Sequence, residues 1–156
     1  MNLIRNFRIG LVLAVLAFCV TGSAALAPIS KFDEFGDIKC EDEMAHLDNF
    51  AVHLQNGPAN KGVIIFYGGR RFRGRLPKRG EAAARAARLK PDLVRRRGIP
   101  TDQVIVIDGG YAEEWSVEVW VVPPGSSMPI PRPTIPVGEI KFRKGRANPR
   151  DYQCRI

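Results

Sequence analysis

The chain of 156 residues carries 24 Lys and Arg against 16 Asp and Glu, so its formal net charge is +8. This length suits one small domain and leaves little room for two. The sequence contains no nucleotide fingerprint, phosphate loop, nucleophile motif or zinc-ligand spacing, so it gives no reason to expect an enzyme, a cofactor or a metal ion.

The first 25 residues have the pattern of a secretory signal peptide. Arg5 and Arg8 precede an apolar run over residues 9–20, and small residues follow over 21–27. The apolar run is shorter than the roughly 20 residues that span a bilayer. We therefore expect export to the periplasm or cell envelope of a bacterium, with no transmembrane segment in the mature chain.

Cleavage is expected after Ala24 or Ala25, and the lipobox-like stretch ending at Cys19 leaves a lipoprotein as an alternative. Cleavage removes Arg5 and Arg8 and no acid, so the net charge falls from +8 to +6. For an exported protein, this charge favours anionic lipid, phosphorylated glycan or peptidoglycan carboxylates as partners over nucleic acid.

The mature chain begins with alternating strand and helix patterns. Residues 29–35 predict a short edge strand. Residues 40–55 predict a helix, because apolar side chains recur every three or four positions from Met44 to Leu54. Residues 62–67 are a continuous apolar run, typical of a central strand buried on both faces, and Gly68 and Gly69 are expected to end it.

A loop and a second helix are predicted next. Residues 70–80 contain Pro and Gly and indicate a loop. Residues 81–97 predict a helix with a narrow apolar stripe, in which Pro91 should remove one backbone hydrogen bond and kink the helix near Lys90.

Two further strands complete the predicted domain. Residues 103–108 form a second apolar strand, and Asp108-Gly109-Gly110 predicts a turn. Residues 114–122 alternate, which places Trp115 and Trp120 on opposite faces of one strand. Strand–helix–strand–helix–strand–strand predicts an α+β fold, a mixed sheet with two helices on one face.

The remaining residues have a different composition. Residues 123–136 contain six prolines and predict an extended, Pro-rich linker. The tail over 137–156 holds a brief strand candidate at 137–143. Cys40 and Cys154 are the two cysteines expected to remain after cleavage. An even number of cysteines in an oxidising compartment predicts a disulfide, although two separate thiols remain the alternative.

Three local features of the predicted domain over 29–122 suggest a family: the helix segment over 47–54, the strand end Tyr67-Gly68-Gly69-Arg70, and Arg85-Ala86 in the second helix. Together with the order of elements, they resemble the OmpA-like domain, the peptidoglycan-anchoring module of bacterial envelopes. The segment over 47–54 looks like the first helix of that family, and Arg85-Ala86 is similar to its Arg-Ala helix. Tyr67-Gly68-Gly69-Arg70 stands where the family has a Gly-His-Thr-Asp turn.

The resemblance implies a ligand site. In that family an aspartate and an arginine hold the zwitterionic end of the peptidoglycan stem peptide. Arg85 matches the arginine, whose planar fork suits a carboxylate. Arg70 stands at the position of the aspartate and would repel an ammonium group.

The basic segment over 70–97 is the most distinctive feature of the mature chain, because it holds twelve cations and two acids. One interpretation is an anion-binding surface, with five candidate ligand-binding residues: Arg85, Arg70, Arg71, Arg73 and Arg88. The other is a solvated face on which Asp92 offsets Arg88 and Arg95. A third hypothesis is an envelope protein–protein module that uses the acidic first helix or the Pro-rich tail.

Two weaker candidates involve other titratable residues. His46 and His53 lie seven residues apart, and two solvated histidines explain them better than a metal site. Asp108 with Glu113 or Glu114 offers the paired carboxylates of a glycoside hydrolase. Ordinary turn chemistry explains these acids better.

Overall fold

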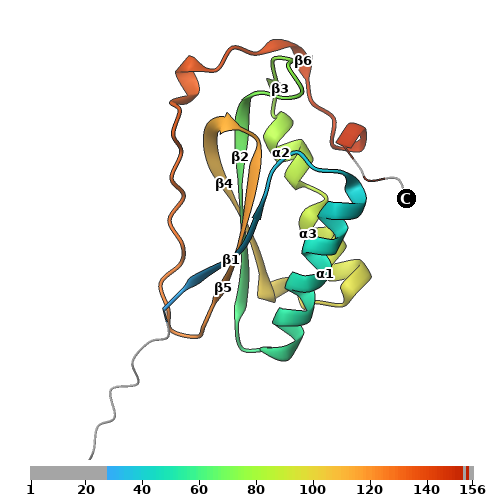
Figure 1. Cartoon of the computed structure of the whole chain (residues 1–156), viewed down its shortest axis with the longest axis vertical. Coiled ribbons are helices and arrows are strands. Elements are labelled where there is room, and N and C mark those ends of the chain that lie inside the picture. Colours follow the sequence, from blue (N-terminus) through green and yellow to red (C-terminus); the bar gives the residue numbers. More distant parts are fainter. Residues whose placement is uncertain (1–27, 153, 155–156) are drawn as a thin grey trace, which may run out of the picture.

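A computed structural model describes residues 28–152 and 154, so the expected signal peptide lies outside the described residues. The main sheet has four strands in the order β1-β5-β2-β4: β1 (Ser30–Phe35), β5 (Ser116–Val122), β2 (Lys61–Arg71) and β4 (Val104–Glu114). β2 and β4 are parallel, whereas the other pairs are antiparallel. Figure 1 shows the helices on one face of this sheet. The predicted α+β class, mixed sheet and placement of the helices are confirmed.

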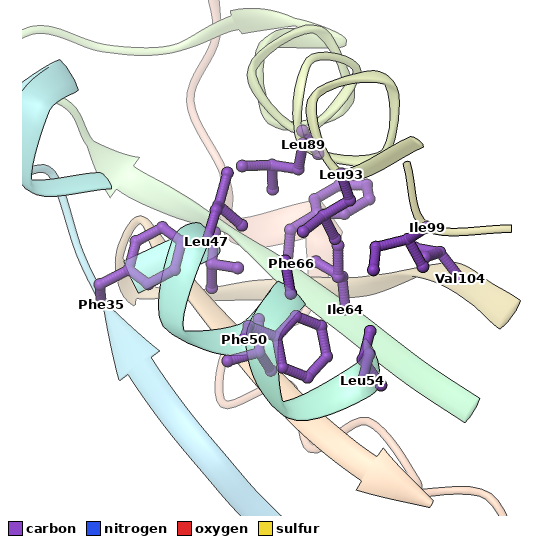
Figure 2. Close-up of a cluster of buried hydrophobic side chains, with 14 of the residues drawn as sticks. Phe35, Leu47, Phe50, Leu54, Ile64, Phe66, Leu89, Leu93, Ile99 and Val104 are labelled. Atoms are coloured by element: carbon purple, nitrogen blue, oxygen red, sulfur yellow. The ribbon is translucent and has the colours of Figure 1, made fainter. Parts of the chain in front are cut away.

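Helix α1 (Cys40–Asn56) packs its apolar stripe against the sheet. Three carboxylates crowd its first turn, where they favour the positive end of the helix dipole. Leu47, Phe50 and Leu54 are almost fully buried, together with side chains of the strands and of the second helical segment. Figure 2 shows this cluster between α1 and the sheet.

The second helical segment is interrupted, although we predicted one kinked helix over 81–97. It comprises α2 (Glu81–Ala86), α3 (Leu89–Pro91) and the π-helical turn η1 (Asp92–Arg96). The break between α2 and α3 falls four residues before Pro91, where the proline ring would clash with the carbonyl of residue 87. Pro91 therefore interrupts the helix two to three residues before Lys90, at residues 87–88.

Two strands are longer than predicted, because their glycines do not end them. β2 continues through Gly68 and Gly69, and a Cβ on Gly69 would lie 2.6 Å from the backbone nitrogen of Trp115. β4 continues past Asp108 through a bulge, where Gly110 has a φ of +83°. The expectation that the strand ends in a turn at Asp108 is wrong, because these glycines permit close packing and a bulge within the strand.

The face of the sheet opposite the helices carries a second hydrophobic cluster, centred on Val63, Ile65 and Tyr67. The Pro-rich segment over 123–136 lies along this face, shown in orange in Figure 1. The backbone N–H of Arg132 donates to the Tyr67 hydroxyl at 3.1 Å. Ile135 is buried and its N–H donates to the Tyr111 carbonyl at 3.0 Å. The segment that we predicted as a linker therefore covers the sheet.

The tail returns to the helical side. After η3 (Val137–Glu139), strand β6 (Arg143–Arg146) pairs in parallel with the short β3 (Lys78–Arg79), and η4 (Pro149–Tyr152) follows. The predicted strand at 137–143 is wrong, because pairing begins only at Arg143. Cys154 is bonded to Cys40, with their Cα atoms 5.6 Å apart, so the predicted pairing is confirmed. Among the described residues, no helix has the length and apolar character needed to cross a membrane.

Candidate functional site

The first turns of α2 hold a buried ion pair. Gly80, with a φ of +74°, turns the chain into the helix, so that Glu81 and Arg85 lie one turn apart. The exposed fractions of their side chains are only 5% and 10%. Arg85 donates to Glu81 Oε1 from Nη2 at 2.7 Å and from Nε at 3.3 Å. Glu81 Oε2 accepts the backbone N–H of Lys78 at 2.7 Å, so both carboxylate oxygens have partners.

Both groups of this pair keep their charge at neutral pH. Burial lowers the pKa of Arg85, and the hydrogen bond with Glu81 opposes this change. Burial raises the pKa of Glu81, but the Lys78 N–H and the Arg85 guanidinium outweigh it, so the pKa lies below its usual value.

Two aromatic rings contact the Arg85 guanidinium. Its Cζ lies 3.0 Å from the ring centroid of Phe72 and 4.5 Å from that of Tyr152. A cation over an aromatic face is attracted by the ring quadrupole. The rings and Glu81 together fix the orientation of the guanidinium.

One edge of Arg85 remains free. Glu81 takes the Nε and Nη2 side, whereas Nη1 has no hydrogen-bond partner among the described residues. No buried side-chain nitrogen or oxygen in this part of the chain lacks a partner, so Nη1 is accessible to solvent. An arginine has five N–H donors, and those at the Nη1–Nη2 end that Glu81 does not use can still donate hydrogen bonds to a planar anion.

Arg85 lines a hollow of about 370 Å³, which we call the Arg85 hollow. Its lining residues are Phe72, Arg73, Arg75, Leu76, Glu81, Arg85, Arg143 and Tyr152. Arg73 pairs with Asp37 at 2.8 Å, and Arg143 lies 3.8 Å from Glu81. Arg75 has no ion pair among the residues that the structure describes. Four arginines and a single carboxylate therefore give the hollow a positive excess.

A neighbouring hollow of about 560 Å³, which we call the Arg70 hollow, is balanced in charge. It is lined by Asp37, Arg70, Arg71, Phe72, Arg73, Gly74, Glu113, Glu114 and Trp115. Arg70 pairs with Glu113 at 3.2 Å and with Glu139 at 3.3 Å. Of the predicted residues, Arg85 lines only the Arg85 hollow, Arg70 and Arg71 line only the Arg70 hollow, and Arg73 lines both.

Arg88 serves a structural contact. It pairs with the buried Glu43 of α1 and donates to the Tyr152 carbonyl at 2.9 Å. The expected offset of Arg88 by Asp92 is wrong, because Asp92 pairs with Arg96 and Arg97.

Several site residues were missed from the sequence. Phe72 lies among the cations of the predicted loop, and Glu81 is one of the two acids of the basic segment, so neither stands out by residue type. Arg143 and Tyr152 come from a tail some 60 residues after α2. The predicted disulfide was the one available signal, since Tyr152 lies two residues before Cys154.

The other candidates have ordinary structural contacts. His46 contacts Asp33, and the His53 ring packs 5.0 Å from Phe32. Asp108 is exposed and accepts the N–H of Gly110 at 2.9 Å, as in an Asx turn. Within the described residues, no three His, Cys, Asp or Glu side chains gather as a metal site would require.

Comparison with known proteins adds no assignment to this geometry. The site is defined by its own residues: a fixed arginine with a free edge, two aromatic rings and an excess of cations. No protein-family model matches the chain, and no curated protein matches it either.

Proposed function

We propose that this chain is an exported, non-catalytic module of the bacterial cell envelope that binds anionic cell-wall groups in the Arg85 hollow. Peptidoglycan, whose stem peptides carry carboxylates, is the first candidate ligand. The observation that carries the proposal is a buried, fixed arginine whose Nη1 has no partner among the described residues and which lines a hollow with excess positive charge.

The arrangement suits an anion for two physical reasons. Glu81 and the rings hold the guanidinium before a ligand arrives, so binding does not have to order this side chain. Arg75 and Arg143 add positive charge at the same hollow, where a partly enclosed setting strengthens electrostatic attraction.

The resemblance to the OmpA-like domain supports the same residue. Arg85 matches the ligand-binding arginine of that family, whereas Arg70 replaces its aspartate and lies in the other hollow. The proposed contact is therefore with an anion alone and lacks a partner for an ammonium group. The signal-peptide pattern over 1–25 and the Cys40–Cys154 bond support export.

An envelope protein–protein module is the second candidate function. Glu41 and Asp42, in the first turn of α1, have no ion pair within the described residues, so they form an acidic surface free to meet a basic partner. This function predicts that the protein ignores cell-wall polymer and captures a defined protein.

Co-sedimentation with purified peptidoglycan tests the first proposal. Arg75→Gln removes a cation from the Arg85 hollow, and Arg95→Gln removes an exposed, unpaired cation from a different surface, so the two variants differ only in place. We expect Arg75→Gln to weaken binding about five- to tenfold, which corresponds to about 1 to 1.4 kcal/mol, the size of one typical hydrogen bond.

The control and the salt dependence complete this test. Arg95→Gln should bind like the wild type, and added salt should weaken both. Equal losses in the two variants would mean a general polyanion surface. No binding by the wild type at low salt would end the cell-wall proposal and favour a protein partner.

A further inference from the structure

Two lining residues of the Arg85 hollow come from the C-terminal tail. We infer that Arg143 and Tyr152 are ligand-contacting residues of the anion site, and that the Cys40–Cys154 disulfide is the device that positions them. This inference rests on the proposed function of the hollow and assigns a role to residues far from the basic segment.

The tail contacts the fixed arginine directly. The Tyr152 ring lies 4.5 Å from Arg85 Cζ, and Nη2 of Arg143 lies 3.8 Å from Oε2 of Glu81. The hollow is thus bounded on one side by the end of β2 and on another by the tail. Without the tail, the hollow keeps Phe72 and Arg75 and loses a ring and a cation.

No residue over 141–152 is fully buried, although the Phe142 ring lies 6.0 Å from that of Tyr111 and 4.7 Å from Arg79 Cζ. The pairing of β6 with β3 also holds the tail, together with backbone hydrogen bonds from Arg143 to Pro77 at 3.0 Å and from Ala147 to Arg79 at 3.1 Å. All these contacts lie at residues 142–147, several residues before Tyr152. Arg88 binds the Tyr152 carbonyl, and the disulfide follows two residues later.

The disulfide is therefore the strongest constraint on Tyr152. Cys40 is the first residue of α1, a helix fixed by the buried cluster, so the bond ties an exposed segment to a rigid element. A short exposed segment released at one end gains conformational freedom, and ordering it again would cost binding free energy. Preorganisation of the hollow depends on this bond.

The position of Tyr152 also allows the opposite role. A ring beside Arg85 that kept ligands away would act as a lid, and releasing it would strengthen binding. The two roles predict opposite signs for the same variants, so one titration separates them.

The test uses the whole protein with two probes, purified peptidoglycan and inorganic phosphate, and follows phosphate by the NMR signal of the Arg85 Nε–H group. The disulfide variant is Cys40→Ser with Cys154→Ser. Tyr152→Ala removes the ring, whereas Tyr152→Phe keeps the ring and removes only the hydroxyl, so the pair separates the two contributions. Arg143→Gln is matched by Arg150→Gln, an exposed, unpaired tail cation.

We expect the disulfide variant, Tyr152→Ala and Arg143→Gln each to bind about three- to tenfold more weakly, as typical of one lost contact, with Arg150→Gln unchanged and Tyr152→Phe weakened less than Tyr152→Ala. If the wild type binds a probe and these variants bind it equally well or more tightly, the inference is overturned and the proposed function stands. Binding of neither probe by the wild type would overturn the proposed function itself. Should the disulfide variant unfold by circular dichroism, the Tyr152 and Arg143 pairs decide the matter.

Discussion

The Glu81–Arg85 pair governs the site at the scale of single residues. A buried ion pair loses hydration on both sides, and the loss is recovered only where hydrogen bonds satisfy the remaining atoms. Here the Lys78 N–H completes the Glu81 carboxylate, and the Phe72 ring covers the guanidinium. The lost hydration of the pair is thus offset by these local contacts. Nη1 of Arg85 remains available to a ligand.

Replacing Glu81 with Gln should destabilise the fold, because Arg85 would stay buried without a carboxylate. We expect a loss of about 3 kcal/mol at pH 7 by denaturant unfolding. Glu139→Gln is the matched control: Glu139 also pairs with an arginine, but its side chain is 58% exposed, and its loss should cost well under 1 kcal/mol. Equal effects would contradict a special role for the buried pair.

The same pair predicts a pH dependence. The folded-state pKa of Glu81 lies below the ordinary value of 4.5, so its ionised form stabilises the protein above that value. This contribution is lost as pH falls through the lowered folded pKa. The difference in unfolding free energy between wild type and Glu81→Gln should therefore be constant from about pH 7 to 5 and shrink in more acid solution. A difference that does not change down to acid unfolding would contradict this assignment.

For single residues, the sequence predicts the chemical type of the contact better than it predicts burial or partners. The family resemblance predicts Arg85 as an anion contact, and this residue type suits a carboxylate. Its burial was not visible, because Glu81 looks like any acid in a first helical turn. The acids that neutralise Arg70 lie 43 and 69 residues away, and no local pattern reveals such partners. The excess charge of the Arg85 hollow emerges only after these pairings are known.

At the scale of elements, β2 and β4 depend on glycines that the sequence marks as breaks. Gly109 is buried in β4 on the face that carries Tyr67 and Ile65. A glycine inside a strand often marks a bulge or a close approach, and both occur here. The apolar runs correctly located the first halves of both strands, because strand-length runs of branched residues are a strong signal. Their ends were set by packing against Tyr111 and Trp115, which lies beyond local patterns.

Gly109→Ala should therefore disturb the core. The added Cβ would lie 2.6 Å from Tyr67 Cε1 and 2.8 Å from Ile65 Cγ2, and both neighbours are buried. We expect a loss of about 1 to 3 kcal/mol in thermal or denaturant unfolding, as typical of overpacking. Gly138→Ala is the control, because nothing lies within 4 Å of its added Cβ and its φ is ordinary. If Gly109→Ala left the unfolding free energy unchanged, the sheet face covered by the Pro-rich segment would be able to expand.

At the scale of the whole molecule, the chain after β5 has two structural roles. Its Pro-rich part covers the sheet face opposite the helices, and its end closes the Arg85 hollow. The proline content predicted the extended conformation, since prolines exclude helix and central strand. It gave no sign of contact with Tyr67, because that contact depends on the sheet already being formed.

The Cys40–Cys154 disulfide encloses nearly the whole domain, because the two cysteines are 114 residues apart in the sequence. Replacing Cys40 and Cys154 with Ser releases the unfolded chain from a long loop, which the chain-entropy model values at about 4 to 5 kcal/mol. We expect a lower urea midpoint and a larger m-value, because the open unfolded chain exposes more surface. Tyr152→Ala keeps the bond and should leave the m-value unchanged. A disulfide variant with the wild-type m-value would mean that the bond acts on the folded tail alone, and the stability loss should then match that of Tyr152→Ala.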